Sequence, residues 1–147
     1  MKVVHENKFC QAYYDEVHKI VWNRYIDLVN PDLLIEMHRA VMKFVVQNPT
    51  VACFYDLTNM KGTFTKTLNF LIKEYEPTLY KNNVIYGSFA MNEKDVFMKF
   101  AMNQMFKVMS TKMELKVHKT IDEACKWLGE KMNATVVMPE LPKMVKA

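Results

Sequence analysis

The segment TVACFY, residues 50–55, is a continuous apolar run that is short enough for a single β-strand. Strands covered on both faces in a parallel sheet have this pattern, whereas strands with one wet face alternate apolar and polar residues. A polar stretch that begins at Asp56 follows the run directly. We therefore predict a central strand of an α/β sheet over residues 50–55, with hydroxyl and carboxyl groups just beyond its end.

Helical patterns and a second apolar run flank this segment. Asn30-Pro31-Asp32 combines a helix N-cap with a proline at the first helical position, and Asn48-Pro49 ends the helix that it starts. Apolar residues at helical spacing predict a second helix from Leu68 to Leu79, which Pro77 is expected to kink or end. The run VIYGSFA, residues 84–90, predicts another covered strand.

Strand and helix patterns continue towards both ends of the chain. The segments FCQAYY (9–14) and VHKIVW (17–22) are rich in β-forming residues and predict an antiparallel hairpin. A third helix is expected from Asn92 onward. An alternating segment over residues 113–118 predicts an edge strand, and a capping box at residues 120–123 predicts the start of the last helix.

The predicted element order is β-β-α-β-α-β-α-β-α. It favours a single α/β domain with a mixed, mostly parallel sheet and helices packed against it. Half of the 147 residues are apolar, which is enough for one compact core. We assign this domain to residues 1–132. Residues 133–147 hold two prolines and no amphipathic pattern, so we expect a tail that is loose or packs on a neighbour.

The third predicted helix has more apolar positions than one narrow stripe needs. Val96, Phe100 and Val108 are expected to form its buried face, and methionines lie on the adjoining side, at positions 98, 102, 105 and 109. Burial is the leading explanation of the surplus. A groove for an acyl chain and the interface of a homodimer are the alternatives.

Charge and hydropathy limit the classes of partner and the compartment. The formal net charge is +4, but 20 basic and 16 acidic residues are interleaved, and no nucleic-acid-binding motif occurs, so we expect no nucleic-acid partner. No apolar run approaches the roughly 20 residues of a membrane-spanning helix, so no stable membrane insertion is expected. The three cysteines are widely spaced and indicate reduced core residues. These features predict a cytoplasmic protein.

No catalytic, metal or cofactor site is predicted. The four histidines have no metal-ligand spacing and are interpreted as surface or core-edge residues: His5, His18, His38 and His118. Three glycines cannot build a glycine-rich phosphate loop. Cys53 lies inside an apolar strand, where desolvation makes it a poor thiolate nucleophile.

Two local motifs support a family resemblance. Asp56-Leu57-Thr58 ends the central strand, with the apolar Met60 following. The last helix contains two acids, an alanine and a Trp-Leu pair: Asp122, Glu123, Ala124, Trp127 and Leu128. Together with the element order over residues 9–132, these motifs resemble the STAS domain, the anti-sigma-factor-antagonist fold, and in particular its SpoIIAA-like branch of small stand-alone proteins.

The resemblance implies a non-enzymatic regulatory or protein-interaction module. Phosphoregulated members carry a serine or threonine at the start of the helix after the central strand, where a partner kinase modifies it. The equivalent residue is Thr65, which follows Phe64 instead of the aspartate of those members. The predicted partner or ligand surface therefore comprises Asp56, Thr58, Asn59 and Thr65, with Thr65 as the possible phosphorylation site. Turn hydrogen bonds and helix capping are the alternative roles of these side chains.

A second function stays open at this point. STAS-like domains are grouped with lipid-carrier folds, so the resemblance also implies, as the alternative, a carrier of a small hydrophobic or lipid-like ligand between the third helix and the sheet. A partner-binding module is expected to lack a large internal cavity. An enzyme is expected to have a pocket with converging polar groups of perturbed pKa.

Overall fold

Strand β4 (Ala52–Lys61) lies in the interior of a six-stranded sheet, between β3 and β5 and parallel to both. Its first six residues are buried, because helices or other segments cover both faces of the sheet there. The prediction of a central strand at this place is confirmed, although the strand begins at Ala52 rather than at residue 50. The structure is a computed structural model, and it describes residues 1–92, 94–109 and 112–144.

The sheet is mixed, with strand order β1-β2-β3-β4-β5-β6. Its other strands are β1 (Lys2–Glu6), β2 (Cys10–Asp15), β3 (Ile20–Leu28), β5 (Tyr86–Ala90) and β6 (Glu114–His118). The first three are antiparallel neighbours, and β3 to β6 are parallel. The predicted α/β class with a mixed sheet is thus confirmed. The predicted hairpin is β2–β3, and β1 is an additional strand that precedes it.

Local capping explains where two of the helices begin. Helix α1 (Pro31–Gln47) begins after Asn30, whose side-chain oxygen accepts a hydrogen bond from the Leu33 backbone N–H at 3.1 Å. Helix α5 (Ile121–Met132) begins after Thr120, whose hydroxyl accepts from the Glu123 N–H, also at 3.1 Å. Both starts agree with the sequence prediction, because an N-cap acts within its own four residues.

The second predicted helix is a continuous but irregular helical segment. It consists of a 3₁₀ turn η1 (Thr65–Thr67), α2 (Leu68–Phe70), a π turn η2 (Leu71–Tyr75) and α3 (Glu76–Lys81). Proline has no N–H and its ring collides with the preceding helical turn. The wider π turn ends at Tyr75, two residues before Pro77, and allows the helical segment to continue.

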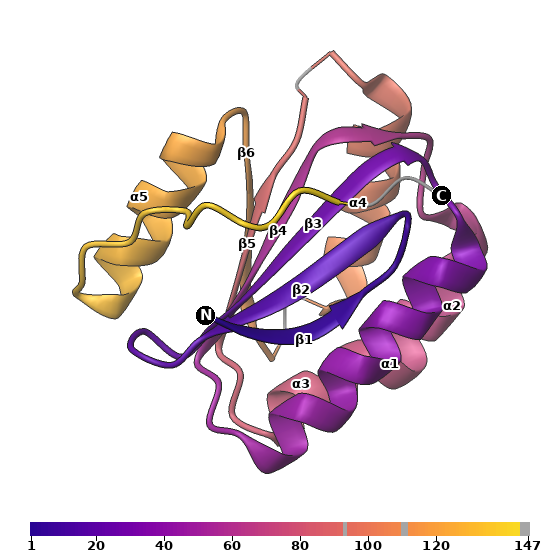
Figure 1. Ribbon diagram of the computed structural model, residues 1–147. Coiled ribbons are helices and arrows are strands. Elements are labelled where there is room, and N and C mark those ends of the chain that lie inside the picture. Colours follow the sequence, from indigo (N-terminus) through magenta and orange to yellow (C-terminus); the bar gives the residue numbers. More distant parts are fainter. Residues whose placement is uncertain (93, 110–111, 145–147) are drawn as a thin grey trace.

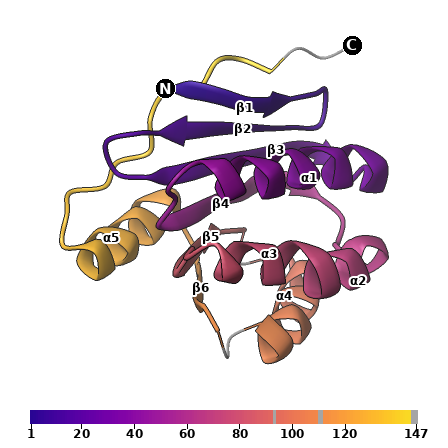
Figure 2. The ribbon, with the colours of Figure 1, turned by 90° about the horizontal axis from the view of Figure 1, so that it is seen from below.

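Helices cover the two faces of the sheet unequally. Figures 1 and 2 show α1, the α2–α3 segment and α4 (Val96–Met109) on one face, and α5 with the C-terminal segment on the other. The predicted tail therefore packs on its own chain up to Met144: Val136 is buried, and Met138 and Leu141 pack against the smaller hydrophobic cluster, which includes Trp22. Helix α5 covers only part of this face of the sheet, and the C-terminal segment packs on the part that α5 leaves open.

Helix α4 is oriented differently from the sequence prediction. Val96, Phe100 and Val108, the expected buried face, are 73%, 62% and 55% exposed. Methionines fill the core instead, at positions 98, 102 and 105. Flexible methionine side chains fit irregular gaps in a core, whereas hydropathy does not distinguish two adjoining apolar faces. That prediction is wrong, and Phe97 at 78% exposure extends the apolar surface.

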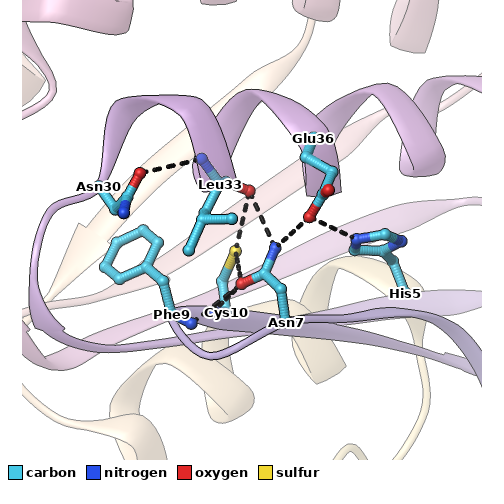
Figure 3. A network of polar contacts seen from close by, with 7 residues as sticks. All are labelled: His5, Asn7, Phe9, Cys10, Asn30, Leu33 and Glu36. Carbon is cyan, nitrogen blue, oxygen red and sulfur yellow. Dashed lines mark hydrogen bonds and ion pairs between the residues drawn. The ribbon is translucent and has the colours of Figure 1, made fainter. Parts of the chain in front are cut away.

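Side chains of and around the turn between β1 and β2 bond to helix α1, as Figure 3 shows, and Asn7 makes most of these contacts. The Asn7 side-chain oxygen accepts hydrogen bonds from the backbone N–H groups of Phe9 and Cys10, both at 2.9 Å. Its amide group donates to the Leu33 carbonyl at 3.1 Å and to the Glu36 carboxylate at 2.9 Å. Asn7 therefore joins the turn between β1 and β2 to the first turns of α1.

Candidate functional site

The polar residues that follow Tyr55 belong to β4 itself. Strand β4 continues to Lys61, paired with β3 as far as Leu28, whereas its register with β5 ends where Asp56 lies opposite Ala90. The end of β4 thus projects beyond β5 at the carboxyl edge of the parallel strands, where open α/β sheets bind ligands. The expectation that the strand ends at residue 55 is wrong, because pairing with β3 extends it through polar residues.

Asp56 stabilises an irregularity in this strand. The pairing of β3 with β4 shifts between Arg24–Asp56 and Ile26–Asn59, so β4 contains one extra residue there. The Asp56 carboxylate accepts hydrogen bonds from the backbone N–H and the hydroxyl of Thr58, at 3.0 and 2.6 Å. Asp56 is 3% exposed. Its carboxylate is therefore used within the strand.

Thr65 lies at the start of the irregular helical segment and is exposed. Its hydroxyl is 3.0 Å from the hydroxyl of Thr63, and Lys66 next to it is also exposed. Of the predicted site residues, Asn59 and Thr65 face solvent, Thr58 is half-buried and Asp56 is buried. The structure joins Asp56 to Thr58 and Thr65 to Thr63, as two separate pairs.

A buried polar cluster between the sheet and the helices was not predicted. The Tyr25 hydroxyl and His38 Nε2 are hydrogen-bonded at 2.7 Å, and the hydroxyls of Tyr55 and Tyr75 are also 2.7 Å apart. The His38 ring lies 4.3 Å from the Tyr75 ring, centroid to centroid. All four side chains are buried. They come from β3, α1, β4 and η2, so the cluster connects two strands with two helical segments.

Burial keeps this cluster electrically neutral. Desolvation lowers the pKa of His38 to about 3. The thiol of Cys53, which adjoins Tyr55 and Tyr75, is also buried, and desolvation raises its pKa to about 12. Desolvation also raises the pKa of Tyr25, Tyr55 and Tyr75. At neutral pH every hydroxyl and thiol keeps its proton, and the imidazole is uncharged. The cluster is a network of neutral hydrogen bonds that holds no ionised nucleophile.

A small cavity of about 30 Å³ adjoins the cluster. Its walls also include the side chains of Phe64, Leu71, Glu76, Leu79, Phe89, Met105, Met113 and Leu115. This volume holds about one or two water molecules. Glu76 Oε1 and His38 Nδ1 are buried there and have no hydrogen-bond partner among the described residues. Desolvation raises the pKa of Glu76 to about 7.

Part of this cluster has a signal in the sequence. His38 stands next to Met37 on the apolar stripe of α1, and it is 3% exposed, so the interpretation of His38 as a surface or core-edge residue is wrong. Glu76 directly precedes Pro77, where a helical irregularity was expected. Tyr25, the hydrogen-bonding partner of His38, lies 13 residues before it in the chain, and no local sequence pattern indicates this pairing.

Metal binding and membrane crossing find no support in the described part of the chain. Residues 1–92, 94–109 and 112–144 contain no group of three or more His, Cys, Asp or Glu side chains arranged to hold a metal ion. Within the same residues no helix has the length and apolarity needed to cross a bilayer.

No protein-family model matches the chain, and no curated protein matches it in sequence.

Proposed function

We propose that the protein is a non-enzymatic, STAS-like regulatory or protein-interaction module that meets a protein partner at the surface formed by Asn59 and Thr65. The observation that carries the proposal is the exposed Thr65 hydroxyl at the start of the helical segment that follows the central strand. Thr58 adjoins this surface, and Asp56 fixes the strand from which it projects.

The charge around Thr65 supports a regulatory role. Lys61 and Lys66 are exposed on either side of it in the sequence. A phosphate on Thr65 would carry between one and two negative charges and three acceptor oxygens, which lysine ammonium groups attract. Phosphorylation would therefore cancel most or all of the local positive charge and add hydrogen-bond acceptors. The three free and buried cysteines, Cys10, Cys53 and Cys125, fit the cytoplasmic location that we infer.

Thr65→Asp is expected to keep the fold, since Thr65 is exposed and an acid is tolerated in a first helical turn, and to reduce partner capture at least about tenfold. The measurement is a pull-down from the native cell with wild-type and variant baits, with intact-mass analysis of the bait for added phosphate. Asn103→Asp is the matched control, because it makes the same charge change at an exposed site on α4. Equal capture by wild type and Thr65→Asp would contradict a switch at this residue.

The alternative function, a carrier of a small hydrophobic ligand, receives less support. The cavity does lie between α4 and the sheet, with Met105 and Leu115 among its walls. Its volume of about 30 Å³ is far below the roughly 300 Å³ of ordinary ligand pockets. A lipid would enter this cavity only if α4 moved away from the sheet. We therefore keep the carrier as the second candidate.

The exposed apolar side of α4 supports a second copy of the chain as a further partner. Phe97 and Phe100 lie three residues apart and point to solvent on one side of the helix. Native mass spectrometry is expected to show a dimer that the double variant Phe97→Ser and Phe100→Ser converts to a monomer. A monomeric wild type would contradict the dimer, and an added lipid mass on the wild type would favour the carrier instead.

A further inference from the structure

The C-terminal segment, residues 134–144, covers the face of β2 and β3 that helices leave open. It starts directly after α5, where Asn133 adopts a left-handed conformation (φ 52°) and the Ala134 N–H donates to the Gly129 carbonyl at 2.9 Å. From there it crosses the strands without forming a helix or a strand of its own (Figure 1). It is a peptide lying on a sheet.

Two kinds of contact hold the segment. Val136 is buried, and Met138 and Leu141 pack against the hydrophobic cluster around Trp22. Further along, the carbonyl of Pro142 accepts hydrogen bonds from Gln11 Nε2 at 3.1 Å and from Arg24 Nη2 at 2.7 Å. One backbone carbonyl therefore receives both polar contacts from side chains of β2 and β3.

Polar atoms remain unpaired beneath the segment. Trp22 and Arg24 share the face of β3 that carries Ile20, because alternate residues of a strand point to the same side. Trp22 Nε1, Arg24 Nε and Gln11 Oε1 are buried without a hydrogen-bond partner among the described residues. Buried polar atoms are nearly always paired in folded proteins, because leaving one unpaired costs its full desolvation.

The two prolines of the segment explain part of this mismatch. A non-proline residue in extended conformation offers a neighbouring side-chain amide both its C=O and its N–H group. Pro142 offers only the C=O, so the oxygen of the Gln11 amide finds no donor there. Pro139 likewise has no N–H, which keeps the segment from pairing as a strand. The segment fits the apolar half of the surface well and the polar half poorly.

We propose that this face is a peptide-binding surface and that residues 134–144 occupy it as a displaceable intramolecular ligand. The partner that it fits is an extended segment of another protein with an acidic, non-proline residue at the place of Pro142. The N–H and C=O of that residue would pair with the Gln11 amide. Its carboxylate would accept from the unpaired Arg24 Nε, because the same guanidinium already donates to the Pro142 carbonyl through Nη2.

The structure also provides a way to release the segment without deleting it. A Cβ atom at Gly129 would lie 2.6 Å from the backbone oxygen of Ala134, which is too close for a real contact. Gly129→Ala should therefore displace the start of the segment. Alanine also suits the helix interior better than glycine, so α5 itself should persist.

The test uses the full chain and two labelled peptides, read by fluorescence anisotropy. One peptide has the sequence of residues 134–144, and the other carries Pro142→Asp. The Gly129→Ala chain is expected to bind the Pro142→Asp peptide about tenfold more tightly than the native peptide, and about tenfold more tightly than wild-type protein binds it. A folded Gly129→Ala chain that binds neither peptide would overturn the proposal, as would equal affinities for the two peptides.

A second measurement covers the case in which Gly129→Ala does not fold. Pro142→Asp within the full chain is expected to raise the melting temperature by a few degrees, because the new residue can donate its N–H to Gln11 Oε1 and accept from Arg24 Nε. Pro139→Asp is the matched control and should give no such rise, since no side chain bonds its carbonyl in the structure's described part. A melting temperature that falls equally in both variants would overturn the proposal. This face shares no residue with the Thr65 surface, so either can fail alone.

Discussion

Replacing Glu76 by glutamine is expected to raise the free energy of unfolding at pH 8.5 by up to about 3 kcal/mol. Glu76 is 5% exposed, its Oε1 has no hydrogen-bond partner among the described residues, and desolvation raises its pKa to about 7. Above that pH the folded protein must hold a buried, unpaired carboxylate. Glutamine fills the same space without a charge, so it removes this penalty.

The sign follows from the direction of the pKa shift. The Glu76 carboxyl has a higher pKa in the folded protein than in the unfolded chain, so its contribution to stability is complete below about pH 4.5 and is lost as the pH rises through about 7. Wild type and Glu76→Gln should therefore differ little at pH 5 and most at pH 8.5. Urea unfolding at several pH values measures the difference.

The effect of Glu76 must be separated from the titration of His38. His38 has a lowered pKa, so it reduces stability as the pH falls below about 6.5, but it does so in both proteins and cancels in their difference. Glu74→Gln is the matched control, because Glu74 is about half exposed and paired with Arg39 on the surface. A pH-independent difference between wild type and Glu76→Gln would contradict the prediction.

Asn7→Ala is expected to lower the free energy of unfolding by roughly 3 kcal/mol, again measured by urea unfolding. The substitution removes the acceptor of two backbone N–H groups, those of the buried Phe9 and Cys10, and also the donor to the Leu33 carbonyl. Alanine cannot replace either function. Strands β1 and β2 should then detach from α1 before the rest of the sheet unfolds.

Lys8→Ala provides the control for Asn7→Ala. Lys8 occupies the same turn but is exposed, so its loss should change the free energy of unfolding by less than about 0.5 kcal/mol. Hydrogen exchange of the β1 and β2 amides should quicken in Asn7→Ala and stay unchanged in Lys8→Ala. Equal stabilities of the two variants would show that the Asn7 network is dispensable.

The parts of the fold that were predictable depend on local chemistry. The Asn30 and Thr120 caps act within four residues, so α1 and α5 could be placed closely. The apolar run at residues 50–55 identified the central strand, because burial on both faces leaves a composition that one short segment carries by itself. The alternation over residues 113–118 likewise identified β6, the last strand of the sheet.

The strands that escaped prediction lack such a pattern. β1 (Lys2–Glu6) has no fully buried residue, so it shows no apolar face in the sequence. The outer half of β4 is polar and is held by backbone pairing with β3, which hydropathy does not record. Strands at these places are determined by their neighbours rather than by their own residues.

The buried polar cluster was missed for a related reason. His38 and Tyr25 are distant along the chain, and only folding brings their hydrogen-bonding atoms to 2.7 Å. The start of a helical segment after a strand is a local feature, whereas a partner surface around Thr65 stays a prediction. Sequence placed that hydroxyl correctly at a helical start, yet it could not show that Asp56 is buried and engaged with Thr58.

The docked C-terminal segment also affects how the chain reaches its native state during synthesis. Gln11 and Arg24 can form their hydrogen bonds to the Pro142 carbonyl only after Pro142 has been synthesised, 131 and 118 residues downstream of them. Contacts of such long range form late, and the ribosome releases residues 134–144 only after the strands that they cover. Until then the apolar side of the nascent sheet around Ile20 and Trp22 is uncovered, so this side is where a chaperone would bind first and where aggregation would begin.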